Sequence, residues 1–186
     1  MNRKSDIKND FEAFVKRQQQ RASEAKQVDW LNEREQWLGY LNKLYETIES
    51  FLAPYTENGR ITHRYREIEL NEENIGTYKA RQMILKIGGQ EIVLTPVGTL
   101  LIGSKGRVDV IGPAGRTRLI LVDREASAPT IKVSVHIGGK PQAAPKEPPH
   151  KKINWAWKIV TTPPAVRFLE LTQESFFRAL MEIANG

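Results

Sequence analysis

Arginine and lysine are the residues of this chain whose types and spacing best suit ligand binding. The stretch KGRVDVIGPAGRTRLILV, residues 105–122, places cations at outward positions of two predicted strands. Arginines form paired hydrogen bonds with phosphate and carboxylate groups. If strand 60–70 lies beside these strands, its arginines join the same face. The candidate anion or nucleic-acid surface then consists of Arg60, Arg64, Arg66, Lys105, Arg107, Arg116 and Arg118.

The same stretch predicts a β-hairpin. A turn centred on residues 113–114 would put Val108 opposite Leu119 and Asp109 opposite Arg118. Arg118 thus gains an acidic neighbour, Asp109, on the adjacent strand. A solvated face that protects the sheet from aggregation is the simpler interpretation of the other cations.

Catalytic and metal-binding patterns are absent from the sequence. The chain has three histidines and no cysteine, and no pair of histidines has the spacing of a helical metal site. His63 could act as a general base, and His63 or Tyr65 could stack on a nucleic-acid base, but a plain surface position is the simpler interpretation of both, and we favour it. The glycine turns match no phosphate-binding loop. We therefore predict no catalytic residue, no cofactor and no metal.

A long amphipathic helix is the clearest element that the sequence predicts. Apolar side chains recur every three to four residues from Trp30 to Leu52, and Pro54 is expected to end the helix. We favour a helix that covers a sheet, with a dimer interface as the alternative. The candidate partner or dimer surface consists of Trp30, Trp37, Leu41, Leu44, Ile48 and Phe51. Upstream, residues 10–27 have few large apolar side chains and predict either a solvated continuation or a separate short helix.

Beyond residue 60 the pattern changes to a period of two. Candidate strands lie at 60–70, 79–87, 90–96, 98–103, 106–111, 116–123, 130–137 and 154–160. Their connections are too short for crossover helices, so neighbouring strands should pair antiparallel. A proline-rich loop is expected at 139–152, where its four lysines and Lys158 read as a second exposed basic cluster. A helix with Thr172 as its N-cap should follow at 173–184.

These elements predict an α+β fold: an N-terminal helical arm at 1–54, and at 55–186 a β-rich domain. That domain would hold a mainly antiparallel meander of about seven or eight strands, twisted or partly closed, with the C-terminal helix packed on it. The 186 residues carry 28 basic and 22 acidic side chains, a net charge of +6. Neither a signal peptide nor a membrane span is apparent, so we expect a cytoplasmic protein.

The predicted function is a non-enzymatic protein-interaction or assembly module. It would be an adaptor or subunit of a complex, and it could self-associate through the N-terminal helix. The alternative is a nucleic-acid-binding protein that uses the basic sheet face. Three segments, 1–54, 55–139 and 140–186, have charge balances of 0, +3 and +3, so no segment is a basic arm. That even distribution favours protein partners over nucleic acid.

Overall fold

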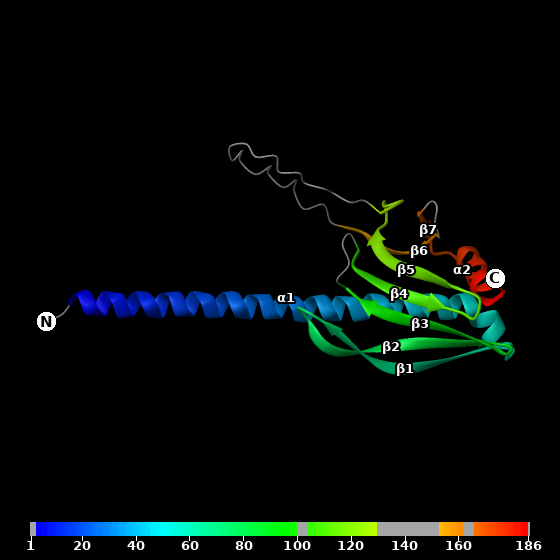
Figure 1. The fold of residues 1–186 in the computed structure, drawn as a ribbon, viewed down its shortest axis with the longest axis horizontal. Coiled ribbons are helices and arrows are strands. Elements are labelled where there is room, and N and C mark those ends of the chain that lie inside the picture. The colour runs from blue at the N-terminus through cyan, green and yellow to red at the C-terminus, as the bar shows by residue number, and fades with distance from the viewer. Residues whose placement is uncertain (1–2, 100–103, 130–152, 162–165, 186) are drawn as a thin grey trace.

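One very long helix, an antiparallel sheet and a short terminal helix make up the protein (Figure 1). The computed structural model describes residues 3–99, 104–129, 153–161 and 166–185, with side chains of the first helix described at 11–20 and from 29 on. The elements are α1 (Arg3–Thr56), β1 (Ile61–Glu72), β2 (Gly76–Ile87), β3 (Gln90–Gly98), β4 (Gly106–Ile111), β5 (Arg116–Asp123), β6 (Trp155–Val160), β7 (Phe168–Glu170) and α2 (Gln173–Asn185). The predicted α+β fold is confirmed.

The seven strands form one sheet in the order in which they occur in the chain, and every neighbouring pair is antiparallel. The order of β1 to β5 follows from their short connections, which return the chain to the adjacent position, whereas residues 124–154 separate β5 from β6. The sheet is open, with β1 and β7 at its edges. Strand β7 was not predicted. The candidate strand 130–137, most of 98–103 and the loop 139–152 lie outside the described residues.

The predicted hairpin is confirmed in its register. Val108 lies opposite Leu119, and Asp109 lies opposite Arg118. The Gly112 N–H donates to the Gly115 carbonyl at 2.9 Å, which closes the turn. Side chains alternate along each strand, so neighbouring residues of a strand point to opposite faces of the sheet.

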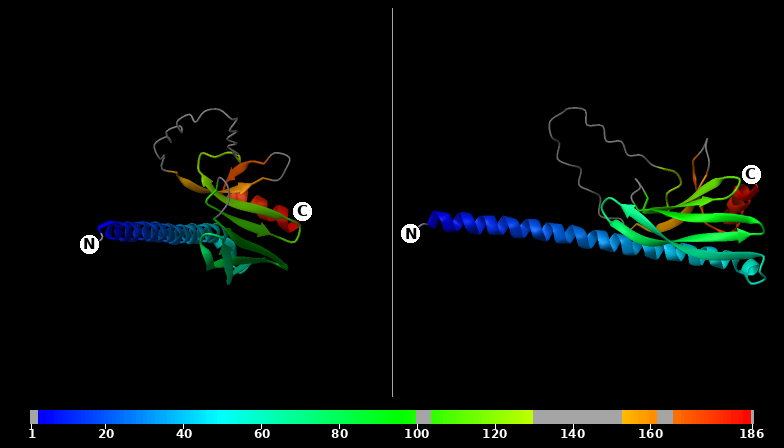
Figure 2. Two further views of the ribbon diagram at one scale, coloured as in Figure 1. Left: turned by 60° about the vertical axis from the view of Figure 1, so that its left-hand side comes forward. Right: turned by 60° about the horizontal axis from the view of Figure 1, so that its bottom comes forward.

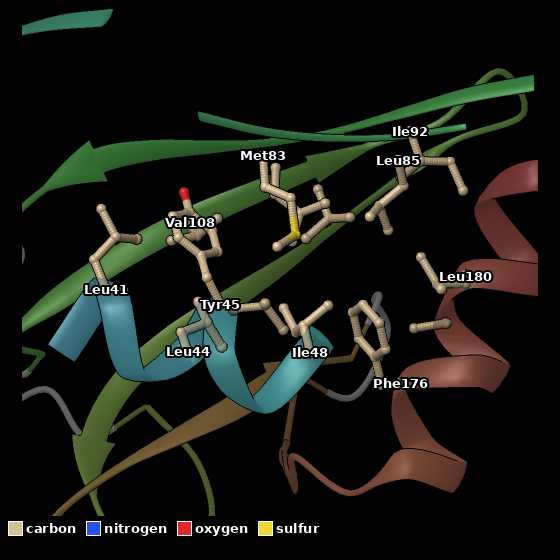
Figure 3. Close-up of a cluster of buried hydrophobic side chains, with 14 of the residues drawn as sticks. Leu41, Leu44, Tyr45, Ile48, Met83, Leu85, Ile92, Val108, Phe176 and Leu180 are labelled. Atoms are coloured by element: carbon tan, nitrogen blue, oxygen red, sulfur yellow. The ribbon is translucent and has the colours of Figure 1, made fainter. Parts of the chain in front are cut away.

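Both helices cover the same face of the sheet, which we call the inner face; the opposite one is the outer face (Figure 2). Figure 3 shows the resulting core, in which Tyr45 and Ile48 of α1 meet Met83 and Leu85 of β2 and Phe176 of α2. Burying each large apolar side chain stabilises the fold by about 1.5–3 kcal/mol. Since the core joins both helices to the inner face, the sheet cannot separate from either helix without exposing it.

Helix α1 is one continuous element. The upstream segment is thus a continuation of the main helix and not a separate one. Pro54 does not end it, contrary to expectation: the helix runs on to Thr56. Proline is compatible with helical φ and removes only its own N–H donor, so the last turn can include it. The chain then turns at Gly59, where φ is 73°.

Candidate functional site

Most of the N-terminal part of α1, which we call the arm and define as residues 3–36, projects beyond the sheet (Figure 1). At 1.5 Å per residue its length is about 50 Å. Every side chain at 11–20 is exposed. Phe11 is 63% exposed and Phe14 49%, and their rings stack with centroids 6.4 Å apart. Val15 and Leu31 are also exposed. The arm therefore presents apolar side chains that no described residue of the chain covers.

The stripe predicted as a partner or dimer surface lies mostly inside the chain's own core. Trp37, Leu41, Leu44 and Ile48 are at most 1% exposed, because the inner face of the sheet covers them. In the structure, this part of α1 thus covers the sheet. Its four buried side chains offer no surface to a partner.

The side chains at the two ends of the stripe are less buried than those at its centre. Trp30 is half-buried, at the start of the covered part of α1. Phe51, near the other end, packs against Phe176 of α2 with ring centroids 6.3 Å apart. Most of the exposed large apolar side chains of the described part of α1 therefore lie in the arm, among them Phe11 and Phe14.

A polar row crosses the outer face from β1 to β5. Arg66 lies opposite Gln82 and donates to its side-chain oxygen from Nε at 3.0 Å and Nη2 at 2.6 Å. Gln82 donates in turn to the Thr95 hydroxyl at 2.7 Å. Thr95 lies opposite Asp109, which lies opposite Arg118. The row thus begins and ends with an arginine.

A second row beside it is apolar at its centre. Register places Ile84 opposite Arg64, Val93 opposite Ile84, Ile111 opposite Val93 and Arg116 opposite Ile111. Ile111 is 48% exposed, Val93 is half-buried and Ile84 is buried. The outer face therefore holds a strip of aliphatic side chains between arginines.

Three of the seven predicted cations have acidic partners. Arg64 pairs with Glu91 of β3 at 3.2 Å, and Arg107 pairs with Asp109 along its own strand at 2.9 Å. Lys105 pairs with Glu33 of α1 at 2.8 Å and lies over the Trp155 ring. Lys105 is thus on the α1 side and does not join the outer face.

The other four cations are Arg60, Arg66, Arg116 and Arg118, all with exposed side chains. None of them forms an ion pair with an acidic residue in the described part of the chain. The structure therefore brings together Arg66, Arg116 and Arg118 on the outer face as cations without a carboxylate.

The aromatic residues proposed for stacking face α1. The Tyr65 hydroxyl donates to Glu49 Oε1 at 2.7 Å, and His63 Nε2 lies 3.1 Å from the same oxygen. The Tyr65 ring packs on Tyr45 and beneath the Arg81 guanidinium. Burial, followed by the hydrogen bond to Glu49, raises the pKa of Tyr65 above its ordinary value. Both side chains are engaged on the inner side and do not serve the outer face.

Lys158 is a buried cation on the outer face of β6, which corrects its assignment to an exposed basic cluster. Its Nζ donates to the Arg124 carbonyl at 2.7 Å and the Ala126 carbonyl at 2.8 Å, and pairs with Glu170 at 2.9 Å. This lysine ties the segment after β5 to the edge of the sheet. Its partners became visible only with the tertiary structure, because they come from two segments distant in sequence, 124–126 and β7.

A cleft of about 470 Å³ lies between the β5–β7 edge and α2. Its lining includes the exposed Leu169 and polar groups of Thr172, Ser175 and Glu182. The Ser175 hydroxyl is already occupied, since it donates to the Glu170 carbonyl at 2.7 Å. In the described part of the chain, no three His, Asp or Glu side chains are arranged to hold a metal ion.

Comparisons with known proteins give no family: the chain matches no family model, no curated protein and no solved structure. Nor does any described helix combine the length and apolarity that crossing a bilayer requires.

Proposed function

We propose that the protein is a non-enzymatic interaction or assembly module in which the sheet domain anchors the projecting arm of α1 and the arm binds a protein partner. The exposed Phe11, Phe14 and Val15 at the far part of the arm carry this proposal. An isolated helix gains little stability in water, and most helices are stabilised by packing of an apolar face. A partner that covers these side chains would supply that packing.

A second copy of the chain is the partner that the protein itself offers. Residues 3–36 contain eight basic and seven acidic side chains, so two arms can approach without strong repulsion. Basic and acidic residues are interspersed along the arm and could pair between two helices. If the two arms run antiparallel, self-association would leave the sheet domains at opposite ends of a paired rod.

Sedimentation equilibrium of the full chain tests self-association. We expect a concentration-dependent dimer that the double variant Phe11→Ser/Phe14→Ser dissociates to monomer. Met181→Ser is the matched control, because Met181 is 61% exposed on α2 and away from the arm. Equal association of both variants would place the dimer contact outside the arm.

A photo-crosslinking amino acid at position 14 tests for other protein partners in the cell. We expect one defined crosslinked species at position 14 and none when the same group replaces Met181. A wild-type chain that is monomeric and also forms no crosslink from position 14 would contradict the proposed function.

Nucleic-acid binding through the basic sheet face has less support. Lys105 lies on the other side of the sheet, and Arg64 and Arg107 are neutralised by carboxylates. Tyr65 packs under α1, so it is not free to stack on a base. Cytoplasmic location is part of the proposed function, and the absence of cysteine from the 186 residues supports it.

A further inference from the structure

The outer face of the sheet has an open part and a covered part. At the β5–β6 end, Val122 is 1% exposed, and Lys158 holds the carbonyls of the segment after β5 against the sheet. Toward the other end of the same strands, Ile111 is 48% exposed and Arg116 and Arg118 are exposed. The two rows that run from β1 to β5 therefore form the open part of the face.

The open part carries positive charge that no described carboxylate neutralises. Arg66 is hydrogen-bonded to a neutral amide, and Arg116 and Arg118 have no described carboxylate as ion-pair partner. The acidic side chains of β3 and β4 are already paired: Glu91 with Arg64, and Asp109 with Arg107. An incoming carboxylate would thus meet arginines whose charge is still available.

From the two rows we infer that the outer face binds an acidic, extended protein segment with aliphatic side chains at its centre and carboxylates toward both ends. The aliphatic centre would lie on Val93 and Ile111, and the carboxylates would pair with Arg66 on one side and with Arg116 and Arg118 on the other. This surface is separate from the arm, so the inference goes beyond the proposed function and does not depend on it.

Strand geometry sets the spacing of the carboxylates. Arg66 and Arg118 are four strand positions apart in the sheet. Four steps of about 4.8 Å give roughly 19 Å, which an extended segment of about six residues spans. A protein segment fits this arrangement better than nucleic acid, because the aromatic residues of β1 to β5, Tyr65 and Tyr78, both pack into the interior.

A fluorescent peptide tests the inference with the full chain. The probe carries two glutamates, then leucine, two valines and leucine, then two glutamates. We expect saturable binding at low salt by fluorescence anisotropy. Binding should weaken by about tenfold or more in Arg66→Gln/Arg118→Gln and also in Ile111→Ser. The matched control Arg167→Gln/Arg178→Gln, which removes two exposed arginines elsewhere, should bind as the wild type does.

Amide chemical shifts of the wild-type protein supply a readout that needs no variant. The peptide should perturb the amides of Val93, Thr95, Asp109 and Ile111. Absence of binding, shifts confined to other elements, or equal weakening in both double variants would overturn the inference. A thymidine oligonucleotide that binds in preference to the peptide and is lost in Arg66→Gln/Arg118→Gln would also overturn it, and would assign the face to nucleic acid.

Discussion

The ring of Trp37 occupies the space that a side chain at position 106 would need. A Cβ atom built on Gly106 would lie 2.1 Å from Cζ3 of Trp37 and 2.5 Å from Cε3. Trp37 is fully buried, and its ring also packs on Trp157 with centroids 5.9 Å apart. Helix α1 can thus lie on the first residue of β4 only because that residue is glycine.

Gly106→Ala should therefore destabilise the fold by about 1–3 kcal/mol, the usual cost of overpacking a filled core. Urea unfolding followed by tryptophan fluorescence measures the change. Gly89→Ala is the control, since a Cβ there meets nothing within 4 Å and φ is not positive. A smaller residue at position 37 should partly relieve the cost, so Trp37→Leu and Gly106→Ala should be less than additive. Equal stability of the two alanine variants would contradict this contact.

Lys158→Met should cost about 1–3 kcal/mol, because it removes two part-buried hydrogen bonds, to the carbonyls of Arg124 and Ala126. Thermal unfolding measures the loss, and faster amide hydrogen exchange at residues 124–126 should accompany it. Lys86→Met is the matched control: Lys86 is exposed, and no described residue pairs with it, so its effect should stay within about 0.5 kcal/mol. If Lys158→Met were as mild as the control, the hydrogen bonds would not be stabilising.

Three of the five tyrosines should make the fold sensitive to alkali. Burial is the largest cause that raises the pKa of Tyr45, Tyr65 and Tyr78 above the ordinary value of 10.0. Hydrogen bonds to Glu49 and Glu72 add to the effect for Tyr65 and Tyr78. A raised folded-state pKa means that the folded state holds the phenol protons more tightly than the unfolded chain does. This contribution to stability is complete below the ordinary pKa and is lost as the pH rises above it.

Urea unfolding between about pH 9 and pH 11 measures this loss as a falling midpoint. Tyrosinate absorbance of the folded protein should lag behind that of the urea-unfolded chain. In Tyr65→Phe, one fewer tyrosine should titrate late. A midpoint that does not change over this range, with all five tyrosines titrating together, would contradict the buried state of the three hydroxyls.

Local patterns in the sequence were sufficient for most of the fold. The register of the 106–123 hairpin follows from a two-residue turn and from alternation, because a shift by one residue would move Val108 and Leu119 to the wrong face. The N-cap of α2 follows from Thr172, whose hydroxyl accepts from the Ser175 N–H. The antiparallel pairing of β1 to β5 follows from connections that are too short for a crossover helix.

Partners distant in sequence could not be inferred in the same way. Lys105 resembled the other hairpin cations, yet its partner is Glu33, which lies 72 residues away. Strand β7 has only three residues, and these are extended because they pair with β6. Arg66 joins the outer row through Gln82 and Thr95, so its role depends on three strands at once.

By itself, the sequence determined the apolar stripe of α1, the helix α2, most strands and their antiparallel pairing, because each depends on neighbours within one turn, one strand or one hairpin. Only the tertiary structure decided which part of that stripe is buried, which cations are neutralised and which arginines share a face. These outcomes depend on distances between segments far apart in the chain, and such distances are set by the packing of the whole core.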